Sequence, residues 1–240
     1  MRFIKFFALI FSLLPSVAFA GFANGVGPAT CTMGPSTTCV ITLNGTTTGD
    51  MIDIVVGYNS ATLTSITISG EANATIIAGA AFSNAGDTFA HAYLPVITSG
   101  GNKTITVNFS GSAFGSAAAK SYSGQDPASQ PDVVPTPITS TSGDPTINPT
   151  TTTNNALIVS TASSNATKPT ASGTGYSAWS FPNPGFYAEV EDNLDVGAAG
   201  SKTVTFGSVT NSTWGINAVA FKAASGAPAQ RRTDHPIIFR

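Results

Sequence analysis

Charged residues are scarce in this sequence. Of its 240 residues, 10 are Lys or Arg and 12 are Asp or Glu, so charged side chains make up 9% of the chain. No basic excess is present, which excludes a general nucleic-acid binder, because such proteins need a positively charged face. Low charge does not predict disorder here, since 42% of the residues are hydrophobic and the net charge is only -2. We therefore expect a folded protein that does not bind nucleic acid.

Long hydrophobic runs are missing beyond the start of the chain. After residue 20 no window holds about 18 consecutive apolar residues, so we expect no membrane-spanning helix in the mature chain. Residues 1–20 combine a basic start, an apolar stretch from Phe6 to Leu14, and small residues at Ala18 and Ala20. These are the three parts of a secretory signal peptide. The sequence thus predicts bacterial-type export, with the protein secreted or at the cell surface.

Cysteine is equally scarce, because Cys31 and Cys39 are the only two. An even pair at short spacing in an oxidising compartment predicts a disulfide bond. A metal site would need more ligands, and neither His91 nor His235 is near the pair in sequence. We therefore predict a structural disulfide, which would hold the N-terminal segment close to the strand expected at 40–43.

Short β-branched segments, separated by Gly, Asn, Ser and Pro, are what the sequence has instead. Residues 103–109 alternate strictly, with Ile105, Val107 and Phe109 on one face, as in a half-buried strand. Residues 51–58 are also short and β-branched, whereas no segment makes a convincing helix. This pattern predicts an all-β fold, an antiparallel β-sandwich of jelly-roll or immunoglobulin-like type.

Two parts of the chain repeat each other. Residues 101–107 (Gly-Asn-Lys-Thr-Ile-Thr-Val) match residues 200–206 (Gly-Ser-Lys-Thr-Val-Thr-Phe), and Tyr122 corresponds to Phe221 at the same offset. The sequence predicts similar half-units at 50–124 and 154–224. Each alone would expose two sheet edges and half a core, so we expect them to pair into one sandwich domain over 21–224.

Two segments lie outside these half-units. Residues 125–153 contain six prolines, which favour extended geometry. We predict a crossover that partly pairs with or covers a sheet edge; the alternative is a flexible linker between two independent domains. Residues 225–240 start with a linker composition and end near an apolar Pro-Ile-Ile-Phe. We predict a flexible tail; the alternative is a strand that docks onto a sheet edge.

Four segments together resemble a widespread group of secreted bacterial β-sandwich proteins of uncharacterised function: residues 50–57, 122–127, 155–159 and 218–222. The resemblance covers roughly residues 40–224 and implies a jelly-roll or immunoglobulin-like fold. It implies no catalytic residues. Lys120 departs from the pattern, since the resemblance implies an acidic or neutral residue before the Tyr-Ser-Gly turn.

The candidates for hydrolytic chemistry are weak. A Ser-His-acid hydrolase needs a histidine between a hydroxyl and a carboxylate. His91 lies in a strand-like segment and His235 in the tail, and no Gly-x-Ser-x-Gly elbow precedes a helix. We expect a surface or sheet histidine at position 91 and a protein that is not an enzyme, with a hydrolase of unrecognised site as a minor alternative.

The densest acidic segment contains Glu189, Glu191, Asp192 and Asp195. If residues 186–191 form a strand, the two glutamates share one face and the two aspartates follow in a turn. Such carboxylates could bind calcium. The interpretation that we favour is a solvated strand edge that discourages aggregation. We therefore expect no cofactor, with a bound calcium ion as the alternative that stays open.

Aromatic residues in a Pro/Gly-rich segment suggest a second kind of site. Trp179, Phe186 and Tyr187 would bind sugars by stacking if they were exposed in one plane. Alternatively, Trp179 fills one end of the sandwich. The sequence therefore predicts a secreted, non-enzymatic adhesion or structural module, with a carbohydrate-binding module as the alternative. The expected partners are extracellular glycans or surface proteins.

Overall fold

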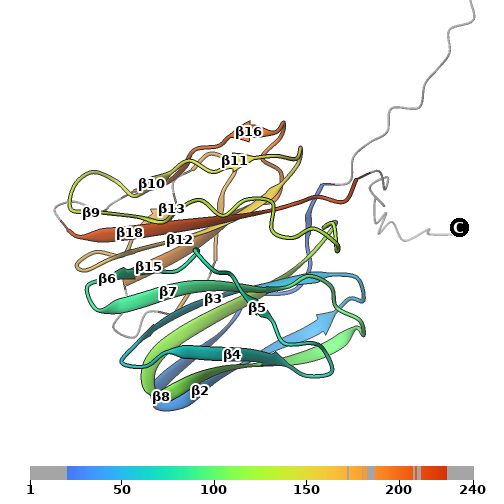
Figure 1. Cartoon of the computed structure of the whole chain (residues 1–240), viewed down its shortest axis with the longest axis horizontal. Helices are drawn as coiled ribbons and strands as arrows, with labels where there is room; N and C mark the ends of the chain where they lie inside the picture. Colours follow the sequence, from blue (N-terminus) through green and yellow to red (C-terminus); the bar gives the residue numbers. More distant parts are fainter. Residues whose placement is uncertain are drawn as a thin grey trace, which may run out of the picture.

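The computed structural model describes residues 21–225, apart from residues 172, 180, 183–186, 208, 210 and 211. Over these residues the regular structure consists of β-strands in several antiparallel sheets that pack together (Figure 1). The predicted all-β class is confirmed. The predicted signal peptide, and all of the tail except Ser225, lie outside the described residues. Within them, no helix is long and apolar enough to cross a membrane.

The structure extends both half-units beyond the predicted bounds of 50–124 and 154–224, because strands from Ala23 onward belong to the first and strands from Ile138 onward belong to the second. The first half-unit is organised around one long strand, β8 (Gly101–Ser123). The first part of β8 pairs with β2 and β4, which makes an outer layer, and β2 continues beside β8 as far as Ala119. Its last part pairs with β3, which pairs in turn with β7, and this makes an inner layer. The other strands are β1 (Ala23–Asn24), β2 (Ala29–Thr46), β3 (Met51–Asn59), β4 (Leu63–Ile68), β5 (Thr75–Ile76), β6 (Phe82–Asn84) and β7 (Asp87–Leu94).

The second half-unit has the same strand order in shorter strands. Its inner layer runs β18–β12–β15, as β8–β3–β7 does in the first, and its outer layer runs β10–β17–β13, as β2–β8–β4 does. The strands are β9 (Ile138–Ser140), β10 (Thr146–Ile147), β11 (Thr150–Thr151), β12 (Leu157–Ser164), β13 (Thr170–Ala171), β14 (Ser177–Ala178), β15 (Tyr187–Asn193), β16 (Gly200–Ser201), β17 (Val204–Gly207) and β18 (Trp214–Phe221).

The register agrees with the repeat seen in the sequence. Met51 is the partner of Tyr122, and Leu157 is the partner of Phe221, so the two matched aromatic residues occupy equivalent places beside the central strands. Where β8 runs unbroken through both layers of the first half-unit, the corresponding chain in the second is divided among β16, β17 and β18.

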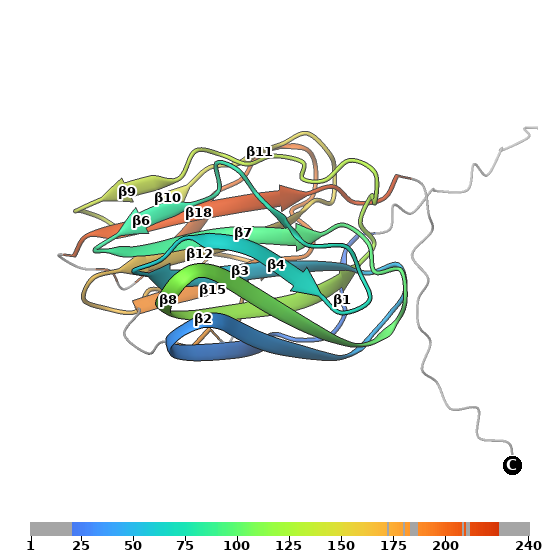
Figure 2. The same cartoon turned by 60° about the horizontal axis from the view of Figure 1, so that its bottom comes forward.

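The layers are stacked and enclose three apolar cores (Figures 1 and 2). One core lies within each half-unit, and the third lies between the two inner layers. The repeat in the sequence predicts one core shared by the half-units. The structure differs because β2 and β4 pair with the first part of β8 and so give the first half-unit a second layer of its own.

The third core consists of side chains from both half-units. Alternation along β3 places Ile52, Ile54 and Val56 in the core of the first half-unit, and Met51 and Val55 in the core between the two. The other large residues of this shared core are Phe89, Tyr93, Tyr122, Leu157, Val159, Trp179, Phe181, Val190, Val219 and Phe221.

The proline-rich crossover covers a sheet edge, as the favoured interpretation proposed. Its strand β9 pairs with β18, and further along the same edge Val133 exchanges backbone hydrogen bonds with Ala220 at 2.9 and 3.3 Å. The alternative of a flexible linker between independent domains is wrong, because the segment supplies β9, β10 and β11 to the second half-unit.

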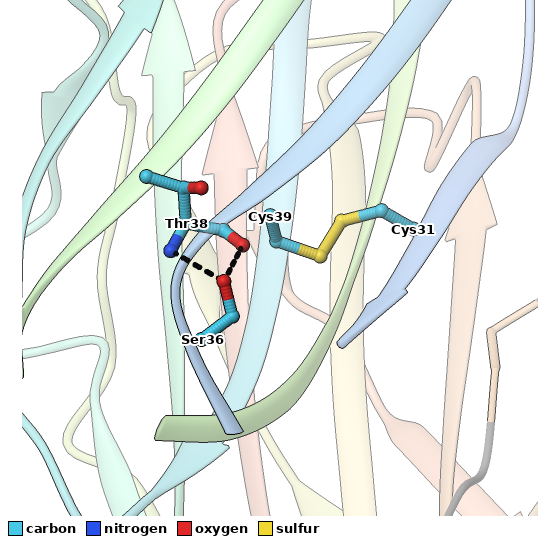
Figure 3. The surroundings of a disulfide bond; sticks show 4 residues. All are labelled: Cys31, Ser36, Thr38 and Cys39. Atoms are coloured by element: carbon cyan, nitrogen blue, oxygen red, sulfur yellow. Dashed lines mark hydrogen bonds between the residues drawn. A yellow bond between two sulfur atoms is a disulfide. The ribbon is translucent and has the colours of Figure 1, made fainter. Parts of the chain in front are cut away.

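The predicted disulfide bond between Cys31 and Cys39 is present, with a Cα–Cα distance of 6.0 Å. Both residues belong to β2, on either side of a stretch where its register to β8 shifts. Figure 3 shows the bond beside Ser36, whose hydroxyl accepts from the Thr38 backbone N–H at 3.2 Å and donates to its carbonyl at 3.0 Å. The bond therefore closes an irregular part of an otherwise long strand.

Replacing both cysteines by serine should lower the free energy of unfolding by about 2–3 kcal/mol, since a loop of this length is then free in the unfolded chain. Urea unfolding of the variant and the parent measures the difference. Labelling of the unreduced, denatured parent should find no free thiol. Full labelling of both cysteines would contradict the bond.

Glu71 closes the turn that follows β4. Its carboxylate accepts hydrogen bonds from the Lys103 ammonium at 2.6 Å, from the Thr98 hydroxyl at 2.6 Å, and from the backbone N–H groups of Thr98 and Ser99. Burial alone would raise the pKa of Glu71, but these four donors outweigh it and hold the pKa at about 2, against an ordinary 4.5. The charged form is thus the one that the fold stabilises.

Glu71→Gln should therefore destabilise the protein in a pH-dependent way. Because the folded-state pKa is lowered, the contribution of Glu71 is complete above pH 4.5 and is lost as the pH falls towards 2. We expect a loss of about 1 kcal/mol at pH 7, since glutamine keeps an oxygen that can accept some of these hydrogen bonds but lacks the charge. Urea unfolding of both proteins from pH 7 to pH 2 measures it, and a difference that does not shrink with acid would contradict the assignment.

Candidate functional site

A buried polar network lies between the two half-units, within the shared apolar core. Asp53, His91 and Lys120 come from β3, β7 and β8 of the first inner layer. The second inner layer supplies the partners, which are Thr161 on β12, Asp192 on β15 and Asn217 on β18. All six residues are buried, and none is more than 7% exposed. Strand alternation explains their placement, because each has apolar residues of the shared core two positions away on its strand.

Asp192 is the centre of one part of the network. Its Oδ2 accepts from Lys120 Nζ at 2.5 Å, from the Tyr122 hydroxyl at 2.6 Å and from Trp179 Nε1 at 2.9 Å. Lys120 Nζ also lies 5.1 Å from the centre of the Tyr122 ring and 5.8 Å from that of Trp179. The ammonium and the carboxylate therefore meet inside an aromatic enclosure, which stabilises the cation from its sides as well.

His91 is the centre of the other part. Its Nε2 lies 3.0 Å from Thr161 Oγ1 and 3.1 Å from Asn217 Oδ1. The Asn217 Nδ2 group donates a hydrogen bond to the backbone carbonyl of Ala80. Because a carbonyl can only accept, this hydrogen bond fixes the orientation of the Asn217 amide. Asn217 thus presents an acceptor to His91, so Nε2 carries a hydrogen. The other ring nitrogen, Nδ1, lies 3.7 Å from Asp53 Oδ2.

Asp53 lies between the two parts. It is the direct cross-strand partner of Lys120 on β8 and of Tyr93 on β7. Burial raises the pKa of Asp53, and the nearby charge of Asp192 adds to the increase, while His91 opposes it. Among the described residues, neither carboxylate oxygen of Asp53 has a hydrogen-bond partner. A proton held by Asp53, or shared with His91 Nδ1, removes the cost of an isolated buried charge.

The order carboxylate, imidazole, hydroxyl in Asp53, His91 and Thr161 is that of a hydrolytic triad. Two features distinguish this arrangement from a working hydrolytic triad. Nε2 of His91 carries a hydrogen and so cannot take the proton of the Thr161 hydroxyl. In addition, all three residues have no exposed surface, so a substrate has no access to them. The network is arranged to join sheets, and His91 is a sheet histidine, one of the two positions expected from the sequence.

The predicted aromatic surface is not formed by Trp179. This residue is only 3% exposed, because its ring packs in the shared core 6.4 Å from Tyr122 and its indole N–H is bonded to Asp192. Tyr187 is 47% exposed, and Phe186 lies outside the described residues. The alternative interpretation, in which Trp179 fills one end of the sandwich, correctly predicts a buried ring, and the structure places that ring in the shared core.

The predicted cluster of acidic residues is also dispersed. Strand β15 continues through Asn193, so Asp192 points into the shared core while Glu189 and Glu191 face the other side. Glu189 pairs with Lys168 at 2.6 Å, Ser160 donates to Glu191 at 3.4 Å, and Asp195 accepts from the Gly197 N–H in the next turn. These four carboxylates therefore do not converge on a calcium ion. No group of three or more His, Cys, Asp or Glu in the described part of the chain could hold a metal.

The interpretation of this segment as a solvated edge is wrong as well. Glu189, Glu191 and Asp192 are all buried, and β14 pairs with β15 beside Glu191 and Asp192. Burial raises the pKa of Glu189, and Lys168 opposes the increase. The sequence could not reveal this, since the partners of these carboxylates lie far away along the chain.

A small polar cavity of about 210 Å³ opens at one end of the second half-unit. The Tyr176 hydroxyl near it has no hydrogen-bond partner among the described residues, and burial together with the charge of Glu191 raises the pKa of Tyr176 above its ordinary value. The residues that line the cavity are Thr174, Tyr176, Asn193, Asp195, Val196, Lys202 and Thr203.

One signal in the sequence could have revealed the network. Asp53, His91 and Lys120 are each flanked on both sides by small or apolar residues within a strand. A lone ionisable residue in such a strand needs a buried partner.

Comparison with models of protein families, with curated proteins and with solved structures finds no match in any of the three.

Proposed function

We propose that this chain is a secreted, non-enzymatic β-sandwich protein that acts as an adhesion or structural module at the cell surface. The observation that carries the proposal is the burial of Asp53, His91, Lys120 and Asp192 between the half-units. These residues make contacts between sheets, and at no more than 7% exposure they have little surface with which to act on a substrate. The signal-peptide pattern at 1–20 and the disulfide bond support an oxidising, extracellular setting.

The organisation of the sheets suits such a role. A module that bridges surfaces must not pair its exposed sheet edges with strands of unrelated chains. In this protein the crossover already covers the β18 edge through β9 and Val133. The disulfide bond closes the irregular part of β2. Together these features favour a rigid body whose exterior is free to make contacts.

Export and turnover test the proposal. The full chain, produced in a bacterial host, should be found outside the cytoplasm without residues 1–20, and a chain that lacks them should remain inside. The purified protein should bind saturably to a surface protein or a glycan, and His91→Gln should leave this binding unchanged. Hydrolysis of ester or glycoside substrates that is lost in His91→Gln would contradict the proposal and favour a hydrolase.

The cavity beside Tyr176 supports a second candidate function, carbohydrate binding. It offers one aromatic side chain together with amide, hydroxyl, carboxylate and ammonium groups, a combination that suits a sugar. On a glycan array, Thr174→Val should reduce binding if the cavity holds the sugar. Tyr187→Ala, an exposed aromatic residue outside the cavity, is the matched control. Equal binding by both variants and the parent would exclude the cavity.

A further inference from the structure

Lys120 and Asp192 make a direct side-chain contact across the shared core. Their Nζ and Oδ2 atoms are 2.5 Å apart, which is direct contact. The residues are 72 positions apart and belong to different half-units. Both side chains are nearly inaccessible, with exposures of 9% and 2%. An amine and a carboxyl group are thus held against each other, largely away from water.

Burial makes a charged pair costly, even with the aromatic rings and hydrogen-bond donors around it. Burial of an ammonium and a carboxylate costs desolvation energy for both ions, and their attraction offsets it only in part. An amide made from the same two groups has no charge and can remain in an apolar core. Fixed proximity of two reacting groups also removes most of the entropic barrier to their reaction.

We propose that Lys120 and Asp192 become joined by an intramolecular isopeptide bond. The neutral Nζ amine attacks Cγ of Asp192, a C–N bond forms, and one Cγ–O bond breaks. The departing oxygen leaves as water and carries two protons that the ammonium form of Lys120 held at the outset. Ammonium and carboxylate thus give one amide and one water, with no oxidation or reduction and no further reactant.

Tyr122 and Trp179 would stabilise the reacting carboxyl group. Both donate to Oδ2 of Asp192, at 2.6 and 2.9 Å. When Nζ attacks Cγ, negative charge develops on the oxygen that remains as the amide carbonyl, and two fixed donors in a dry site are suited to hold it. In this role Oδ2 stays and Oδ1 departs.

Asp53 is placed to carry the protons. It is the cross-strand partner of Lys120 on the same face of the sheet, where directly opposed side chains lie about 4.5–5.5 Å apart at Cβ. Burial raises the pKa of Asp53, so a proton can reside on it, and His91 Nδ1 lies 3.7 Å away on its other side. Neither carboxylate oxygen of Asp53 has a hydrogen-bond partner among the described residues, so the proposal requires the Asp53 side chain to approach Nζ, take a proton from it and return that proton to the departing oxygen.

The bond would link the two half-units covalently across their shared core. This proposal goes beyond the proposed function, because the isopeptide bond does not depend on which partner the protein binds. It also accounts for a lysine at position 120, where the resemblance noted in the sequence implies an acidic or neutral residue.

The mass of the intact chain tests the proposal without any substitution. After reduction of the disulfide, the mass should be lower than that of the linear sequence by one water, about 18 Da. A protease site inserted after the exposed Gly143 separates the halves. The cut protein should run as one band on a denaturing, reducing gel. A full linear mass together with two bands would overturn the proposal.

Three variants assign the roles. Lys120→Met and Asp192→Ala should restore the linear mass and give two bands after cutting. Asp53→Asn should leave most of the chain unlinked while circular dichroism shows the parent's β-sheet signal, and complete linkage in it would overturn the role of Asp53. Lys103→Met is the matched control, since Lys103 contacts Glu71 at 2.6 Å outside the network. Its cut form should remain one band, and two bands would overturn the assignment to Lys120.

Discussion

Asp192→Ala should lower the free energy of unfolding by at least about 3–5 kcal/mol, which is the cost of removing one partner of a buried pair before the loss of the proposed covalent bond is added. The substitution removes the acceptor for Lys120, Tyr122 and Trp179 at once and leaves the ammonium of Lys120 in an apolar core. Burial raises the pKa of the Tyr122 hydroxyl well above its ordinary value, so that group must still find an acceptor. Urea unfolding followed by tryptophan fluorescence measures the loss.

Asp195→Ala is the matched control for this substitution. Asp195 lies three positions further along in an exposed turn, where its carboxylate accepts from the Gly197 N–H at 2.8 Å. Loss of that bond should cost at most about 1 kcal/mol. Similar losses in the two variants would show that Asp192 has no special place in the fold.

Trp179→Ala should destabilise the protein by about 3–5 kcal/mol, the usual cost of removing a large aromatic side chain from a core. It leaves a cavity beside Tyr122 and removes one donor to Asp192. Tyr187→Ala removes an aromatic side chain that is about half exposed and should change stability by less than about 1 kcal/mol. Thermal unfolding of the two variants and the parent provides the comparison.

The same pair of variants separates a structural from a binding role for Trp179. If its ring is exposed and binds sugar, Trp179→Ala should unfold like the parent and lose only glycan binding. A melting temperature unchanged within error would therefore contradict the buried position of the ring. A fall of several degrees in Trp179→Ala alone is the result that we expect.

The sequence was informative wherever the signal is local. Alternation at 103–109 located part of β8, the spacing of Cys31 and Cys39 indicated a disulfide, and the prolines of 125–153 indicated an edge-covering crossover. Each of these depends on residues close together in the chain. They were enough to predict the all-β class and the position of the crossover.

The candidate site could not be predicted in the same way, because its contacts join distant strands. Alternation along the strand shows that Asp192 and Glu191 lie on opposite faces. It does not show that Lys120 donates to Asp192 or that Ser160 donates to Glu191. In the sequence, Lys120 stands out only as a departure from the pattern of the resemblance. The Pro and Gly neighbours of Trp179 are compatible with an exposed ring and with a buried one, so they do not predict that the ring turns inward.

The central claim is that Lys120 and Asp192 join the two half-units across their shared core. A double-mutant cycle with Lys120→Met, Asp192→Ala and the double variant tests it most directly, with the free energy of unfolding measured for all four proteins. We predict a coupling free energy of about 2 kcal/mol or more, because either single substitution leaves its buried partner without a counterpart. Effects that add within about 0.5 kcal/mol would show that the two side chains do not act together, and would contradict the account.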